Sequence, residues 1–258
     1  PNVALHGSSA YCSSCIIFEP MGGAACKPVK YRCDCLRNVG ETEMLVESHE
    51  AVRHEWIASL PGWPPLLARR FEPVDGMIPR PDDIRILGFN VLADGKQGEE
   101  QWECTPWDAL LWEFRRWRLL EACISHEPDA LLLQEVDAKY FESFFQDQLS
   151  RVGYSGHFCA KSGSKPDGVA IFWRDTRLKL INHETVRFFD GSPEASAVAL
   201  FHDRETNQKL VLASAHLCGG KDEAAEIKRH SQVEQLLGHI QSFSGDVPVI
   251  LAADLNAE

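Results

Sequence analysis

Short apolar runs typical of β-strands alternate unevenly with amphipathic segments from residue 84 to residue 258, and this alternation limits the folds open to the chain. Three segments have the apolar spacing of helices, at 108–125, 139–152 and 223–243. The strand-like runs are IRILGFNVL, DALLLQEV, YSGHFCA, GVAIFWR, LKLINHETVRFF, AVALFHD, KLVLASAHL and VPVILAAD. Many strands and few helices favour an α/β fold of two packed sheets covered by helices over a doubly wound sheet.

The first 83 residues have a different composition. Residues 1–40 are expected to form an irregular leader, and they hold five of the nine cysteines. A zinc knuckle is one interpretation of the spacing of Cys12, Cys15, Cys33 and Cys35. The second pair is too close and lacks a nearby histidine, so a reduced or lipidated leader is the simpler interpretation. Residues 41–58 predict one amphipathic helix, and the prolines of 59–83 predict a linker or wrapping arm. The chain thus divides into 1–40, 41–83 and 84–258.

The charge and hydropathy of the chain exclude some classes of function. The net charge is −12 at pH 7, which disfavours nonspecific binding to DNA and requires any phosphate site to be a local basic pocket. No apolar stretch approaches the about 20 residues that span a bilayer, and no signal peptide is visible. The remaining cysteines are scattered, as in proteins of reducing compartments, so we expect an intracellular protein, cytoplasmic or mitochondrial.

Four strand-like runs end in polar residues that an apolar strand does not need for its own structure. They are Asn90, Glu135, His216, and Asp254 with Asn256. Each has a simpler explanation alone, as a turn former, a cap, a core imidazole or the end of a strand. If the strand ends converge, these residues form one oxygen-rich site with an imidazole beside it. Carboxylate and amide oxygens suit Mg²⁺ better than zinc, and Mg²⁺ with a general base is the chemistry of phosphoester hydrolysis.

Five ordered motifs resemble those of the endonuclease/exonuclease/phosphatase superfamily. They are FNVLADG, LLLQEVD, KPDGVAIFW, SAHL and AADLN. Within it the chain is most similar to the nocturnin and deadenylase group, through the segment from LLWEFRRW to QEVD and through LSRVGYSGHF. The resemblance implies a DNase-I-like fold for 84–258, a four-layer α/β sandwich of two packed mixed β-sheets flanked by helices.

The resemblance also implies roles for the residues at the strand ends. Glu135 would be the principal Mg²⁺ ligand, with Asn90 beside it. Asp254 would orient or deprotonate the attacking water, and Asn256 would hold a phosphate oxygen. His216 would donate a hydrogen bond to the phosphoryl group in the transition state. Magnesium is therefore the expected cofactor.

Further residues are implied around this centre. Asp167 would support the site through hydrogen bonds, and the glycine that follows it would permit close backbone approach. Lys161 matches a lysine that contacts the substrate in the nocturnin group. Arg229 and Gln232 match an R-x-x-Q pair near the pocket, although a solvated helix face is an equal alternative. Ser196 stands where the family has an asparagine.

The chain departs from the family pattern in two further places. Cys218, Gly219 and Gly220 follow the histidine of SAHL, where the nocturnin group has a basic Lys-x-Arg. The strand that ends in AADLN is followed by no final Ser-Asp-His, whose histidine contacts the scissile phosphate in the family. Because the chain also starts at Pro1, we expect it to be cut at both ends and incomplete at the C-terminus. A piece lacking that histidine is expected not to turn over substrate by itself.

Three functions follow from the resemblance and its departures. The first is a Mg²⁺-dependent phosphoesterase that hydrolyses the 2′-phosphate of NADP(H), so that a nucleotide is the expected partner. The second is a 3′–5′ poly(A)-specific exoribonuclease, or mRNA deadenylase, that binds an RNA 3′ end. The third is a catalytically inactive member that binds a ligand or partner, which the altered phosphate-binding motif and the missing histidine suggest.

Overall fold

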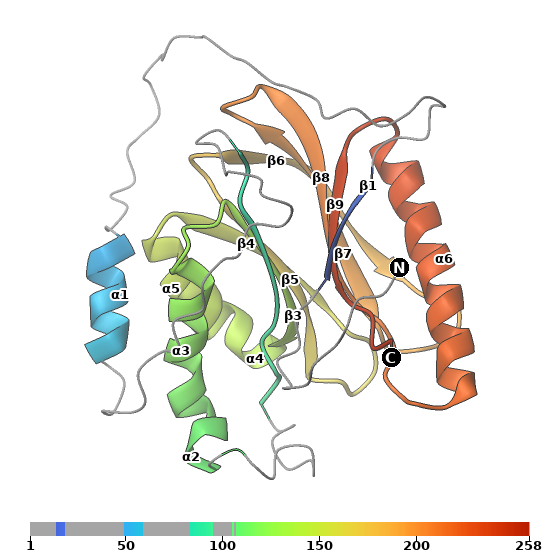
Figure 1. The fold of residues 1–258 in the computed structure, drawn as a ribbon, viewed down its shortest axis with the longest axis horizontal. Coiled ribbons are helices and arrows are strands. Elements are labelled where there is room, and N and C mark those ends of the chain that lie inside the picture. Colours follow the sequence, from blue (N-terminus) through green and yellow to red (C-terminus); the bar gives the residue numbers. More distant parts are fainter. Residues whose placement is uncertain (1–13, 19–48, 59–82, 95–104, 106, 258) are drawn as a thin grey trace, which may run out of the picture.

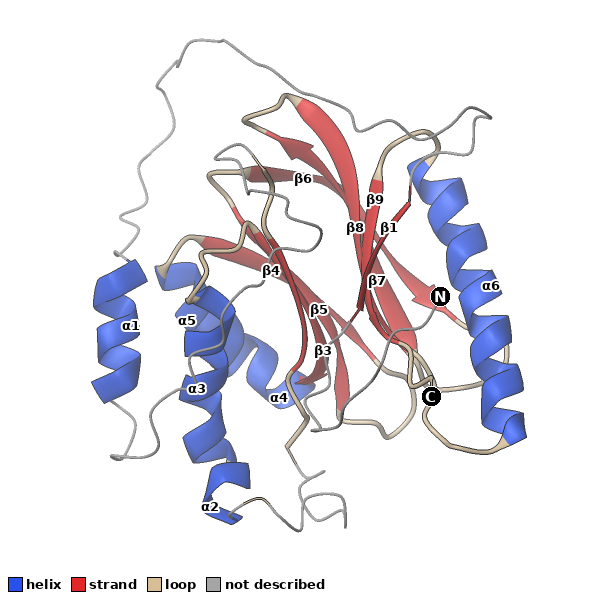
Figure 2. Ribbon diagram, in the orientation of Figure 1, coloured by secondary structure: helices blue, strands red, loops and turns tan. Residues whose placement is uncertain are grey.

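Two β-sheets packed face to face form the centre of the molecule, and helices cover the outer face of each sheet (Figure 1). The computed structural model describes residues 14–18, 49–58, 83–94, 105 and 107–257. The layers follow the order helix, sheet, sheet, helix, which is the four-layer α/β sandwich expected from the sequence (Figure 2). Each strand-like run predicted from residue 84 onward contributes one strand to this sandwich.

The larger sheet has five strands in the order β1-β9-β8-β7-β6. Their bounds are β1 Ser14–Phe18, β6 Leu178–Arg187, β7 Ala195–Asp203, β8 Gln208–His216 and β9 Val249–Asp254. β8 and β9 are parallel, and the other neighbours are antiparallel. The parallel pair matters for function because the carboxyl ends of β8 and β9 reach the same edge of the sheet.

The smaller sheet has four strands in the order β2-β3-β5-β4, and it also contains one parallel pair. Their bounds are β2 Ile86–Asn90, β3 Ala130–Asp137, β4 Tyr154–Ala160 and β5 Asp167–Arg174. β2 and β3 are parallel, whereas β5 runs antiparallel to both β3 and β4. Each sheet therefore offers one pair of parallel strand ends.

The core between the sheets is built from alternate residues of the facing strands. In β7, Ala195, Ala197, Ala199 and Phe201 belong to this core, whereas Val198 belongs to the core on the other face. This period of two is the alternation expected of a strand, and the small alanines let the sheets approach closely. Both faces of the central strands are buried, which explains their almost continuous apolar sequences.

A long helix covers the outer face of the five-stranded sheet. α6 (Glu223–Ser244) packs Leu236 and Ile240 against that face. Its N-cap Asp222 accepts a hydrogen bond from the Ala225 amide at 2.8 Å, which satisfies one of the otherwise unpaired amides of the first turn. At the other end, Gly245 has a φ of 56°, a left-handed conformation that glycine adopts without a steric penalty.

The outer face of the four-stranded sheet is covered by shorter helices. They are α1 (His49–Ala58), α2 (Trp107–Leu110), α3 (Trp112–Ile124), α4 (Ala138–Tyr140), the π-helix η3 (Phe141–Gln146) and α5 (Asp147–Arg151). Trp56 of α1, Leu120 of α3 and Phe145 of η3 lie in one core cluster with Leu133 of β3. None of the helices in the described ranges is long and apolar enough to cross a membrane.

The structure corrects three details of the sequence analysis. Ser14–Phe18, expected to be part of an irregular leader, forms β1, because its Cys-Ile-Ile-Phe run favours extended backbone and β9 has an open edge to pair with. The helix expected over 108–125 is broken at Leu111, whose extended backbone starts α3. The helix expected over 139–152 contains a π-helical turn that buries both Phe144 and Phe145. The other leader residues, residues 41–48 of the expected helix and residues 59–82 of the proline-rich arm lie outside the described residues. The zinc-knuckle interpretation therefore also lies outside them, since Cys12, Cys33 and Cys35 are not described.

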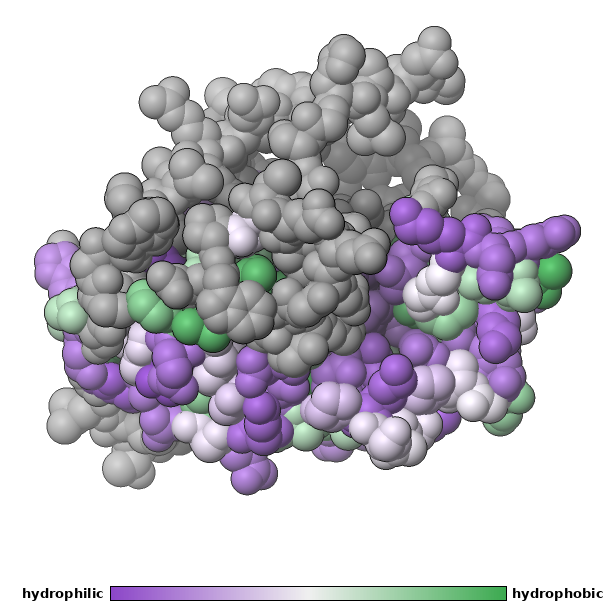
Figure 3. Space-filling view, turned by 90° about the horizontal axis from the view of Figure 1, so that it is seen from below, coloured by the Kyte–Doolittle hydropathy of each residue, from purple (hydrophilic) through white to green (hydrophobic). Residues whose placement is uncertain are grey.

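The described surface is mainly hydrophilic on the face that Figure 3 shows, with hydrophobic residues scattered among the polar ones. Such scattering is normal for proteins in water. The net charge is −12, and the described hydrophobic residues on the face in Figure 3 form no single patch. The functional groups are therefore sought in local clusters of side chains.

Candidate active site

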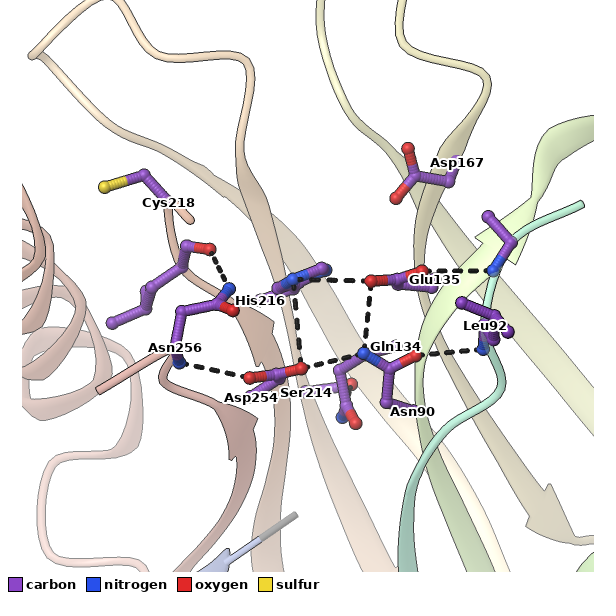
Figure 4. Close-up of polar contacts among 12 residues, drawn as sticks. Asn90, Leu92, Gln134, Glu135, Asp167, Ser214, His216, Cys218, Asp254 and Asn256 are labelled. Carbon is purple, nitrogen blue, oxygen red and sulfur yellow. Dashed lines mark hydrogen bonds and ion pairs between the residues drawn. The ribbon is translucent and has the colours of Figure 1, made fainter. Parts of the chain in front are cut away.

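The carboxyl ends of the two parallel strand pairs meet, and they bring four of the predicted residues together (Figure 4). Asn90 at the end of β2 donates from Nδ2 to Glu135 Oε1 of β3 at 3.2 Å. The same amide donates to Asp254 Oδ2 of β9 at 2.7 Å. His216 ends β8 directly beside Asp254 in the register of the sheet. Asn90 thus joins the two sheets by hydrogen bonds, as the convergence hypothesis required.

A β-bulge aims Glu135 at this site. The register between β3 and β5 shifts between Gln134 and Val136, and Glu135 has a φ of 58°. Gln134 is buried between the sheets, where its Nε2 donates to Ser214 Oγ at 3.0 Å. A non-glycine residue in the left-handed region costs about 1–2 kcal/mol, so the surrounding contacts must hold it in place. The bulge is a local distortion of the kind found beside active sites.

The turn after β2 supplies those contacts. Leu92, with a φ of 56°, donates its amide to Asn90 Oδ1 at 2.9 Å. The Ala93 amide donates to Glu135 Oε2 at 3.0 Å, so that Oε1 lies toward Asn90 and His216. Glu135 is only 8% exposed, and a buried carboxylate requires such charge-assisted bonds.

His216 lies between a buried ion pair and the two carboxylates. Its Nε2 is 3.8 Å from Glu135 Oε1 and 3.9 Å from Asp254 Oδ2, while its Nδ1 is 3.3 Å from Lys161 Nζ. Lys161 also forms an ion pair with Asp167 at 2.9 Å. An ammonium group can only donate, so Nδ1 of His216 accepts and the ring proton is assigned to Nε2. That proton faces the site.

Asp254 is oriented by its own neighbours. The Asn256 amide donates to Asp254 Oδ1 at 3.1 Å, and Asn256 Nδ2 donates to the Leu217 carbonyl at 2.9 Å. Asn256 has a φ of 49°, a conformation that asparagine tolerates better than most residues. Both oxygens of Asp254 therefore have fixed hydrogen-bond donors, one of them from the opposite sheet.

Three of the predicted substrate residues make no hydrogen bond to this cluster in the described structure. The Arg229 guanidinium is buried and donates to the carbonyls of Cys218 and Gly220 at 3.2 and 2.8 Å. Gln232 accepts from the Cys218 amide at 2.9 Å and donates to the loop before β7. Ser196 is fully buried, and its Oγ has no hydrogen-bond partner among the described residues. Substrate contact by these three residues stays a prediction.

The sequence analysis missed two residues beside the site. Asp137, two positions after Glu135, accepts from the Asp94 amide at 2.6 Å, and burial raises the pKa of its carboxyl group. Arg115 of α3 donates to the carbonyls of Val91 and Leu92 at 3.1 and 2.9 Å. The acidic end of the buried QEVD run could have indicated Asp137. Nothing in the local sequence distinguishes Arg115 from the neighbouring arginines.

The donor set fits a hard cation that keeps part of its water shell. Glu135 and Asp254 place carboxylate oxygens on either side of Asn90, and Mg²⁺ commonly binds proteins through one or two carboxylates. The described residues contain no group of three histidine, cysteine or acidic side chains arranged to hold a metal ion. Glu135 and Asn90, with Asp254 near them, are the residues that could hold Mg²⁺.

Two mixed sheets with flanking helices and polar residues at the converging strand ends define the DNase-I-like class of α/β sandwiches. Residues 88–258 match the Endonuclease/Exonuclease/phosphatase family. The chain therefore belongs to this family, as its five motifs suggested.

Curated relatives of the chain include nocturnins and deadenylase-related proteins. Nocturnin of Rattus norvegicus is 34% identical over 190 residues, which cover 68% of this chain and 44% of the rat protein. Carbon catabolite repressor protein 4 homolog 3 of Arabidopsis thaliana is 28% identical over 181 residues, covering 67% of this chain and 39% of that protein. The chain thus spans less than half the length of these two relatives.

Solved structures give the same fold. The human Nocturnin catalytic domain with bound sulfate anion superposes with a TM-score of 0.58 at 30% identity, covering 68% of this chain and 64% of that one. ANGEL2, a 2′,3′-cyclic phosphatase, superposes with a TM-score of 0.62 at 22% identity, covering 67% of this chain and 53% of that one. The second likeness supports the fold alone.

Proposed function

We propose that this chain carries the phosphoester-cleaving site of a Mg²⁺-dependent phosphoesterase that removes the 2′-phosphate from NADP(H). The observation that carries the proposal is the convergence of Asn90, Glu135, His216 and Asp254 through contacts across two sheets. Scattered surface groups would not need buried partners, whereas a phosphoryl-transfer site needs its charged groups held in place before the substrate arrives.

Each residue has a role that its contacts support. Glu135 and Asn90 would hold the cation, which when bound would neutralise charge on the phosphate oxygens. Asp254, fixed by the amides of Asn90 and Asn256, would orient the attacking water and accept its proton. The Nε2 proton of His216 would donate to a phosphate oxygen as charge develops, with Lys161 holding the ring by its other nitrogen.

Two considerations favour a dinucleotide over a long polyanion. The chain is acidic overall, with a net charge of −12, which opposes the approach of an extended phosphate backbone. The resemblance to the nocturnin group, supported by 34% identity to the rat protein, points to the 2′-phosphate of NADP(H).

A 3′–5′ poly(A)-specific exoribonuclease is the second candidate. The CCR4-Not complex 3′-5′-exoribonuclease subunit Ccr4 of Emericella nidulans is 25% identical over 165 residues, covering 53% of this chain. The same hydrolytic residues would serve that reaction, because both reactions cleave a phosphoester. The difference would lie in the groups that bind the remainder of the substrate.

A non-catalytic binding member is the third candidate, and one feature favours it. Cys218, Gly219 and Gly220 provide no cation where the nocturnin group has Lys-x-Arg. Arg229 donates to the carbonyls of Cys218 and Gly220 in this segment and to the carboxylate of Glu226. Against this candidate, a site without catalytic use has no physical need to keep several buried polar groups in contact.

One set of measurements separates the three candidates. NADP⁺ and NAD⁺ are titrated into the purified chain in the presence of Mg²⁺, and phosphate release is followed separately with the full-length protein. Because the two nucleotides differ only in the 2′-phosphate, we expect the chain to bind NADP⁺ more tightly and the full-length protein to release phosphate from NADP⁺ alone. Equal affinity of the chain for both nucleotides, together with no phosphate release by the full-length protein, would refute the NADP(H) proposal.

The controls use one variant and a second substrate. Glu135→Ala should abolish phosphate release, and unchanged turnover would refute the assignment of the metal ligand. Stepwise shortening of an oligo(A) RNA, without phosphate release from NADP⁺, would favour the exoribonuclease. No hydrolysis of either substrate by the wild type, together with ligand binding that survives Glu135→Ala, would favour the binding protein. The matched region covers 44% of the nocturnin relative from rat. The binding readout is therefore useful by itself, because it tests only residues of this chain.

A further inference from the structure

The turn that follows β2 directs successive backbone amides toward the site. The Val91 amide donates to the Gln134 carbonyl at 2.9 Å, and the Leu92 amide donates to Asn90 Oδ1 at 2.9 Å. The next two amides, of Ala93 and Asp94, donate to the carboxylates of Glu135 and Asp137 at 3.0 and 2.6 Å. The shape of this turn therefore fixes where the Glu135 carboxylate lies.

One guanidinium holds the turn from the other side. Arg115 Nη1 donates to the carbonyls of Val91 and Leu92 at 3.1 and 2.9 Å, and Arg115 Nε donates to the Leu110 carbonyl at 2.8 Å. The Leu110 carbonyl is at the end of α2, just before the extended backbone of Leu111, where a helix leaves carbonyls unpaired. Arg115 therefore connects the helix break to the turn.

The contacts of Arg115 indicate that it holds the backbone of the turn in place. Its Nε and Nη1 donate to main-chain carbonyls, and its remaining nitrogen, Nη2, is buried without a hydrogen-bond partner among the described residues. Burial lowers the pKa of Arg115, and the nearby charges of Asp94, Asp137 and Glu135 act in the opposite direction. A guanidinium stays protonated in proteins and has a rigid fork of donors, which suits three carbonyls at fixed positions.

We propose that Arg115 is a positioning residue for the cation site, because it fixes the Val91–Ala93 backbone and through the Ala93 amide the orientation of Glu135. The left-handed φ of 56° at Leu92 supports this role, since a strained turn persists only where its surroundings hold it. The inference rests on the proposed function in one respect, namely that Glu135 is a ligand of the cation.

The test compares Arg115 with its neighbour on α3. Arg116 is partly buried, pairs with Glu113 at 2.5 Å and lies over the rings of Trp117 and Phe144. Its partners are thus residues other than those of the turn, so Arg116→Met is a matched control for the loss of one arginine from α3. Mn²⁺ alone is titrated into wild type, Arg115→Met, Arg115→Lys and Arg116→Met, with binding followed by the electron paramagnetic resonance signal of free Mn²⁺. Loss of a residue that supports a metal ligand typically weakens metal binding about 10- to 100-fold, and we expect that range for Arg115→Met.

Arg115→Lys separates geometry from charge. A lysine keeps the positive charge but cannot reach three carbonyls with a rigid fork, so a positioning role predicts weak binding in this variant as well. Recovery of wild-type affinity in Arg115→Lys would overturn the proposal, because charge alone would then suffice. Equal affinity in Arg115→Met and wild type would also overturn it, as would an equal loss in Arg116→Met.

A second measurement does not depend on the metal. Amide hydrogen exchange at Leu92, Ala93 and Asp94 should accelerate in both Arg115 variants and stay unchanged in Arg116→Met. Unchanged exchange in Arg115→Lys would overturn the proposal even if Arg115→Met failed to fold. Absence of Mn²⁺ binding in wild type, or equal Mn²⁺ affinity in wild type and Glu135→Ala, would refute the proposed metal site. The role of Arg115 toward a cation would then be refuted as well. Weak binding only in Glu135→Ala would leave the metal site standing and refute the role of Arg115.

Discussion

Replacing Gly168 by alanine should destabilise the sandwich by forcing two strands apart. A Cβ atom on Gly168 would lie 2.2 Å from the Cys159 carbonyl oxygen and 2.9 Å from the Ala160 Cα. Both neighbours are backbone atoms of β4, so no flexible side chain can move to make room. Contacts of a Cβ below 3.0 Å are essentially never found, so the carbonyl must retreat by at least 0.8 Å or β5 must shift by as much.

The expected cost follows from this overlap. Inserting one methyl group into a well-packed core typically costs about 1–3 kcal/mol, and backbone overlap places this variant toward the upper end. A loss of that size lowers the melting temperature of a protein of about 150–250 residues by about 2–4 °C per kcal/mol. We therefore expect a decrease of about 5–12 °C for Gly168→Ala.

The assay is a thermal denaturation of wild type, Gly168→Ala and Gly219→Ala. Gly219 is the matched control, because a Cβ there would meet no atom within 4 Å. Surface substitutions usually change stability by about 0.5 kcal/mol or less, so the control should melt within about 2 °C of wild type. A melting temperature of Gly168→Ala within that same range would refute the steric reasoning.

The same variant tests the link between the strand and the site. Asp167 precedes Gly168, and the Lys161 amide donates to the Asp167 carbonyl at 3.0 Å across the β4–β5 pair. Displacement of β4 should therefore disturb the Lys161–His216 contact as well as the overall stability. The nucleotide titration described above, repeated at a temperature where Gly168→Ala is folded, should show weaker binding of NADP⁺.

Three further predictions concern buried or half-buried polar groups outside the hydrogen-bonded cluster of the site. Ser196→Ala should keep or raise the melting temperature, because the unpaired hydroxyl costs about 1–3 kcal/mol in the folded state; a clear decrease would contradict this. Arg177→Met should lose about 3–5 kcal/mol in urea denaturation, because it leaves Asp203 buried without its partner at 2.7 Å, whereas the exposed Arg204→Met should lose little. Burial, and secondarily the charge of a neighbouring histidine, lower the pKa of His157, so the unfolded chain binds this proton more readily. Stability should therefore fall as the pH drops below about 6.5, and His157→Phe should reduce that fall when melting is compared at about pH 7.5 and about pH 5.5.

The sequence predicted the strands that have clear hydrophobic runs and the polar residues that stand at the ends of those runs. The runs that end in Asn90, Glu135, His216 and Asp254 became strands, and their polar ends lie together because the parallel pairs β2–β3 and β8–β9 end on adjacent edges. Local sequence could predict this much because hydrophobic alternation and chain breaks are local properties.

The remaining features depend on contacts between distant parts of the chain. The bulge at Glu135 is not visible in a run that is buried on both faces, since alternation gives no signal there. Arg115 and Arg229 are arginines on amphipathic helices, and only the fold shows that each donates to the carbonyls of a loop. The break at Leu111 likewise became visible only in the fold, where Arg115 contacts the end of α2.

The hydrogen bond between Asn90 and Asp254 joins the two sheets, so the geometry of the site depends on how the sheets are aligned. The length of this bond is 2.7 Å, and N–H···O distances in proteins lie within about 2.7–3.2 Å, so the bond tolerates about half an ångström of sliding of one sheet over the other. Core residues far from the strand ends, such as Ala197 and Ala199 of β7, thereby gain influence over ligand geometry. A substitution that shifts the sheets by half an ångström or so should change ligand affinity before it measurably loosens the fold, so natural variation in this core would be read first as altered specificity.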